Sequence, residues 1–80
     1  MLNAQFTVTW PDGQRATAQI QAESAEANYP VQYAGARERI IEPPAESDVA
    51  FLSFVMRQTA DQTGGTFEET VTGDYSRYAA

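Results

Sequence analysis

The first 22 residues fit one β-hairpin in one register. If Pro11-Asp12-Gly13 is the turn, Trp10 lies opposite Gln14, and the flanking strands alternate between two kinds of pair. Four facing pairs are apolar: Val8–Ala16, Phe6–Ala18, Ala4–Ile20 and Leu2–Ala22. The intervening pairs are polar: Thr9–Arg15, Thr7–Thr17 and Gln5–Gln19. Because a shift of one residue would mix the two sets, the pattern predicts this register.

The predicted turn has the residues that its geometry needs. Pro11 suits the second position of a type I turn, and Gly13 suits the left-handed residue of a following G1 bulge. Trp10 lies beside this turn and faces only Gln14, so we expect its side chain at the surface.

Residues 48–63 have the pattern of an amphipathic helix. Ser47 or Asp48 can cap its N-terminus, and Gly64 suits its end. An apolar stripe follows the helical spacing: Val49, Leu52, Val55, Met56 and Ala60. The four phenylalanines are expected in the core with this stripe: Phe6, Phe51, Phe54 and Phe67.

The middle of the chain is less regular. Residues 23–30 form either one or two helical turns capped by Ser24 or a polar loop, because Pro30 stops a helix early. Gly35 weakens a helix in residues 31–42. We therefore expect a strand over residues 37–42, preceded by irregular chain and followed by two prolines.

Residues 66–75 alternate as a strand. One face carries Phe67, Glu69 and Val71, and Glu68 lies on the other. A glutamate between two apolar residues is typical of a half-buried strand at a sheet edge, where an inward charge discourages unwanted pairing.

Together these elements predict an α+β fold in one small domain, residues 1–80. An antiparallel sheet would contain the N-terminal hairpin, a third strand and the C-terminal strand, with one helix packed across it. The alternative is a small all-β barrel in which residues 49–56 form a central strand, because a short apolar run cannot be assigned by periodicity alone.

The composition argues against an enzyme. The chain has no histidine and no lysine, so its hydroxyl groups lack an activating base. Glu68 and Glu69 are adjacent on a strand, point to opposite faces and cannot share a substrate. Gly64-Gly65 is not followed by a lysine, as a phosphate-binding loop requires. We expect no catalytic activity and no cofactor.

A metal site is not expected either. The chain has no cysteine and no histidine, which are the usual zinc ligands. Asp61, Thr63 and Glu68 place oxygen atoms around the glycine pair, as calcium loops do, but the alternating acidic ligands of an EF-hand are missing. We interpret this segment as a helix end followed by a strand, with a calcium site as the alternative.

The charge indicates the class of partner. With 11 acidic and 5 basic residues, the net charge is −6, which opposes direct binding to nucleic acid and suits a basic surface on another protein.

No segment is long and apolar enough to span a bilayer, and the N-terminus lacks the regions of a secretory signal. We expect a monomer or homodimer in the cytoplasm of a microbe or an infected cell.

The candidate partner-binding residues lie near the C-terminus. Carboxylates steer a basic partner, and tyrosines supply contact area at interfaces. The predicted surface comprises Glu68, Glu69, Asp74, Tyr75 and Tyr78.

This profile is similar to that of phage-encoded inhibitors of bacterial defence, such as anti-CRISPR proteins. The likeness is one of small size, acidity and lack of histidine and cysteine, and it assigns no residues. It implies an inhibitor that blocks a basic nucleic-acid-binding surface. The alternative is a structural or assembly protein, such as a virion component or an accessory subunit, which would expose apolar surface when alone.

Overall fold

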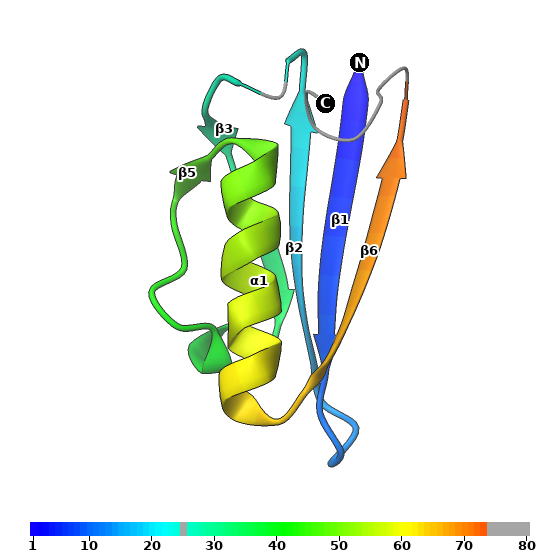
Figure 1. Ribbon diagram of the computed structural model, residues 1–80, viewed down its shortest axis with the longest axis vertical. Coiled ribbons are helices and arrows are strands. Elements are labelled where there is room, and N and C mark those ends of the chain that lie inside the picture. The colour runs from blue at the N-terminus through cyan, green and yellow to red at the C-terminus, as the bar shows by residue number, and fades with distance from the viewer. Residues whose placement is uncertain (25, 74–80) are drawn as a thin grey trace.

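A computed structural model describes residues 1–24 and 26–73 of the chain. Its main sheet is antiparallel, with strand order β4-β2-β1-β6, and the helix α1 packs against one face (Figure 1). The strands of this sheet are β1 (Leu2–Thr9), β2 (Arg15–Ala22), β4 (Gln32–Gly35) and β6 (Thr66–Thr72). The sheet is open, so the predicted α+β class is confirmed and the barrel alternative is wrong.

Four further elements complete the described fold. Helix α1 spans Val49–Thr63, and a short 3-10 helix, η1, spans Arg37–Arg39. A two-stranded ribbon is formed by β3 (Tyr29–Pro30) and β5 (Glu46–Ser47) beside the N-terminal end of α1 (Figure 1).

The hairpin register is confirmed at every pair. Phe6 lies opposite Ala18, and Val8 lies opposite Ala16. The turn also has the expected form, because Gly13 N–H donates to the Trp10 carbonyl at 2.9 Å and Gly13 has φ +89°. The apolar pairs form the floor of the core: Leu2, Ala4, Phe6, Val8, Ala16, Ala18, Ile20 and Ala22 are all buried.

Helix α1 has the predicted ends and the predicted stripe. The Asp48 side chain caps it by accepting from the Phe51 N–H at 2.6 Å, and Gly64 ends it with φ +77°. Val49, Leu52, Val55, Met56 and Ala60 are buried against the sheet.

The prediction that Phe51 and Phe54 lie in the core is wrong, because Phe51 is 51% and Phe54 is 56% exposed. A single helix over a single sheet buries only one side of the helix, and no described element covers the other side.

The expected surface position of Trp10 is also wrong. Trp10 is 4% exposed, because it continues the β1 alternation of Phe6 and Val8 towards the helix side. Its Nε1–H donates to Thr63 Oγ1 at 2.8 Å, which joins the hairpin end to the last turn of α1.

The third strand exists, but it lies earlier than predicted. Strand β4 ends at Gly35, which has φ +82° and whose added Cβ would lie 2.1 Å from the Arg15 carbonyl oxygen. This turn takes the chain out of the sheet, so residues 37–39 form η1 instead of a strand.

Residues 23–30, apart from the undescribed position 25, form bends and β3. Of the two alternatives for this segment, the loop is therefore confirmed and the short helix is wrong.

Strand β6 lies at one edge of the sheet, as the alternating pattern indicated. It pairs antiparallel with β1, placing Phe67 opposite Val8 and Glu69 opposite Phe6. Residues 74 and 75, which were expected to continue this strand, lie outside the described residues.

Candidate protein-interaction surfaces

The predicted acidic surface is described only in part. Glu68 is exposed, whereas Glu69 is half-buried on the helix side of β6, where it accepts a hydrogen bond from Ser53 Oγ at 3.0 Å. The two carboxylates therefore lie on opposite faces of the sheet. Asp74, Tyr75 and Tyr78 lie outside the described residues.

A second surface lies on the side of α1 that faces away from the sheet. Four exposed residues follow one another along this side: Phe51, Phe54, Gln58 and Asp61. We call them the outer face of α1. Their spacing of three or four residues keeps them on one side of a helix, opposite the buried stripe.

The aromatic pair gives the outer face its apolar centre. The ring centroids of Phe51 and Phe54 lie 6.3 Å apart with an interplanar angle of 31°, within the range of favourable aromatic contacts. Each phenylalanine thus buries part of the other's ring while leaving more than half of its own surface in water. The pair has a preformed shape that does not depend on a partner.

Carboxylates border this aromatic pair at both ends. Asp48 caps the helix turn that carries Phe51, and Glu46 lies exposed in the adjacent β5. Asp61 lies two turns beyond Phe54 on the same side of the helix. The outer face therefore combines an apolar centre with negatively charged ends.

Three of the four arginines among the described residues lie over aromatic rings. The Cζ atoms of Arg37, Arg39 and Arg57 lie 5.3, 4.9 and 4.7 Å from the ring centroids of Tyr33, Trp10 and Phe67. These guanidinium groups serve the fold by covering rings, a role for which a planar cation is well suited. Arg57 is itself exposed on α1, three residues after Phe54 and four before Asp61, so one cation borders the outer face.

The side of the sheet remote from α1 is polar. Its side chains are mainly threonine and glutamine, exemplified by Gln5, Gln19 and Thr70, and the hydroxyls of Thr7 and Thr17 lie 3.3 Å apart. Arg15 and Glu68 are charged residues on this side. A surface of this kind remains hydrated and offers little apolar area to a partner.

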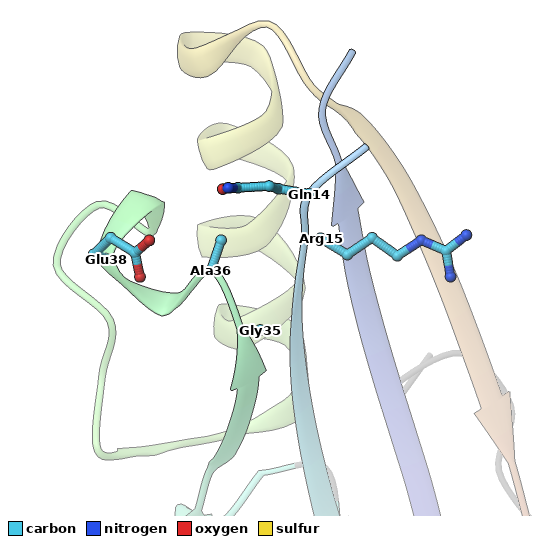
Figure 2. Close-up of a pocket in the computed structure, with 5 residues that line it drawn as sticks. All are labelled: Gln14, Arg15, Gly35, Ala36 and Glu38. Carbon is cyan, nitrogen blue, oxygen red and sulfur yellow. The ribbon is translucent and has the colours of Figure 1, made fainter. Parts of the chain in front are cut away.

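Two hollows mark the surface near β4. One is lined by Gln14, Arg15, Gly35, Ala36 and Glu38, and Figure 2 shows the Gln14 side chain extending towards the side of Ala36 and Glu38, while that of Arg15 extends the opposite way. The other is lined by Gln19, Gln21, Pro30 and Gln32. Ligand sites have polar groups that converge on one volume within apolar walls, and neither hollow has that combination.

Within the described residues, no three or more acidic side chains lie close enough together to hold a metal ion. No helix in that part of the chain is long and apolar enough to cross a membrane.

Comparison with protein-family models, curated proteins and solved structures finds no match to this chain.

Helical geometry in the sequence already indicates that Phe54 lies away from the buried stripe of α1. Successive residues of a helix are rotated by about 100°, so Phe54 lies on the side opposite a stripe centred on Leu52 and Met56. Treating every phenylalanine as a core residue concealed this, although exposed apolar residues are common and only their grouping is informative.

Proposed function

We propose that this protein is a non-enzymatic binding protein that attaches to a larger protein through the outer face of α1. The exposed pair Phe51 and Phe54 carries this proposal. Aromatic side chains that become desolvated in a complex supply much of the binding energy at protein interfaces. A preformed pair of such rings on a rigid helix loses little conformational freedom on binding.

The aromatic pair would be the centre of the interface and not the whole of it. A phenylalanine side chain buries about 150–250 Å² when fully covered, so two half-exposed rings offer on the order of 200 Å². A typical interface buries about 800 Å² on each partner. The rest would come from the polar and acidic residues of the outer face and from neighbouring β5.

The charge of the chain selects the class of partner. With a net charge of −6 and carboxylates at both ends of the outer face, association with a basic surface is favoured and steered. Surfaces that bind nucleic acid are basic because they neutralise phosphates. The proposed activity is therefore the blocking of such a surface, as in the phage-encoded inhibitors to which the sequence profile is similar.

The exposed aromatic pair also favours a second candidate, an assembly subunit that uses this apolar surface to join other copies or other structural proteins. Two copies meeting through the outer face would bring their carboxylates together, which weakens self-association at low salt. Sedimentation over a range of protein concentrations separates the candidates. The blocking protein stays a monomer or dimer, whereas the assembly subunit grows with concentration.

Site-specific crosslinking tests the proposed surface directly. A benzophenone-bearing phenylalanine is placed at position 54, or at the exposed position 21 of β2 on the remote side of the sheet as a control, in cells where the protein occurs naturally. The proposal predicts one defined crosslinked protein from position 54 that excess unmodified protein competes away. Equal products from both positions, or products that resist competition, would contradict it.

A further inference from the structure

The two edges of the main sheet differ in how they are covered. Strand β4 is short, and a later part of the chain, residues 44–45, lies beside it. Tyr33 Oη donates to the Pro44 carbonyl at 2.6 Å, and Val31 N–H donates to the Ala45 carbonyl at 2.9 Å. Strand β6 is seven residues long and is the outermost described element on its side of the sheet (Figure 1).

The core is also less completely closed along β6. Phe67 and Val71 on the helix side of this strand are half-buried, whereas their partners Val8 and Ala4 on β1 are fully buried. Arg57 covers the Phe67 ring from the helix. A further strand beside β6 would bury this row of side chains and pair the backbone groups that an edge strand leaves unpaired.

We propose that the edge of β6 accepts an extended basic segment of another protein as a fifth strand. This surface is separate from the outer face of α1, and the inference does not depend on that proposal. Strand addition takes its affinity from main-chain hydrogen bonds and its specificity from alternate side chains. Here the adjacent Glu68 and Glu69 place one carboxylate on each face, so two consecutive cations in the added strand would each lie opposite a carboxylate.

The same carboxylates disfavour a second copy of this chain as the added strand. The antiparallel register that pairs all of residues 66–72 with their copies centres on residue 69. It would place Glu69 directly opposite Glu69 of the other chain, on the half-buried side, where like charges are destabilising. The acidic pair therefore selects a basic partner and acts against self-pairing.

The test uses a synthetic peptide designed for antiparallel pairing with residues 66–72. The probe is acetyl-Thr-Val-Thr-Lys-Lys-Val-Thr-amide, which places its two lysines opposite the glutamates. One control peptide replaces both lysines with glutamate, and another replaces both valines with proline, which cannot pair along a strand. Each is titrated into the full-length protein at low salt while backbone amides are followed by NMR.

The inference predicts saturable shifts in the amides of residues 66–72 with the lysine peptide, slower hydrogen exchange there, and neither effect with the control peptides. The variant Glu68→Gln with Glu69→Gln should bind the probe at least fivefold more weakly while keeping its circular dichroism spectrum. The matched variant Glu23→Gln with Glu26→Gln, which removes the same charge elsewhere, should bind it as the original protein does.

Three results would overturn the inference. Equal weakening in both glutamine variants would show non-specific attraction by net charge. Shifts in β6 that depend on protein concentration without peptide would show self-pairing. Slow hydrogen exchange at every β6 amide before any peptide is added would show that the edge is already occupied.

Discussion

The guanidinium group of Arg39 lies over the indole ring of Trp10, with its Cζ atom 4.9 Å from the ring centroid. Its Nη2 atom also forms an ion pair with Asp12 Oδ2 at 2.7 Å. One arginine from η1 therefore covers the end of the core and contacts the hairpin turn.

Removal of this arginine should expose the tryptophan. We expect Arg39→Ala to move the fluorescence emission of Trp10 to longer wavelength and to lower the free energy of unfolding by about 1 kcal/mol, the usual size of a cation–π contact. Trp10 is the single tryptophan, so its emission is unambiguous. Arg37→Ala, which uncovers Tyr33 instead, should leave the emission unchanged. An unshifted spectrum in Arg39→Ala would contradict the contact.

The same arginine governs the ionisation of Asp12. Its hydrogen bond, assisted by the Gln14 N–H, holds the pKa of the Asp12 carboxyl below its ordinary value of 3.8. Because the folded pKa is the lower one, this contribution to stability is present above the unfolded pKa and is lost as the pH falls through the folded pKa. We expect Arg39→Gln to raise the Asp12 pKa, measured by carboxyl carbon NMR. A pKa that does not rise would contradict the assignment.

Two residues of α1, two positions apart, should respond in opposite ways to truncation. Leu52 is fully buried, so Leu52→Ala should cost about 2–5 kcal/mol of unfolding free energy in urea denaturation. Phe54→Ala should change it by no more than about 0.5 kcal/mol, because the ring is mainly in water. Comparable costs for both variants would show that the helix packs through another face.

Close packing between the helix end and the hairpin makes Gly65 sensitive. A Cβ atom at this position would lie 2.6 Å from Val8 Cγ1 and 3.1 Å from Trp10 Nε1. We expect Gly65→Ala to cost about 1–3 kcal/mol, as overpacked cores do. Since the clash involves Val8, the cost of Val8→Ala should be smaller in the Gly65→Ala background, and additive costs would contradict this contact.

The local elements of this fold could be predicted because each had its own signal in neighbouring residues. The hairpin register followed from alternating pairs around Pro11-Asp12-Gly13, and the ends of α1 followed from Asp48 and Gly64. Strand β6 was placed at an edge by Glu69, an inward charge that an interior strand would not carry.

The errors came from contacts between residues far apart in the chain. The position of η1 depends on Arg39 reaching Trp10 and Asp12, and the early end of β4 depends on Gly35 approaching the Arg15 carbonyl. Neither contact has a periodic pattern. The exposure of Phe51 and Phe54 depends on how many layers cover the helix, which its own sequence does not specify. The aromatic pair of the candidate site was therefore assigned to the core.

The central claim is that the outer face of α1 binds the partner, and the affinity of the purified crosslinked partner tests it most directly. Isothermal titration should show that Phe51→Ser with Phe54→Ser lowers affinity at least about 100-fold, equivalent to about 2.8 kcal/mol, while Gln21→Ala on the remote side of the sheet leaves it unchanged. Both variants should retain the original unfolding transition. A change of less than about threefold in the folded double variant, about 0.7 kcal/mol, would contradict the claim.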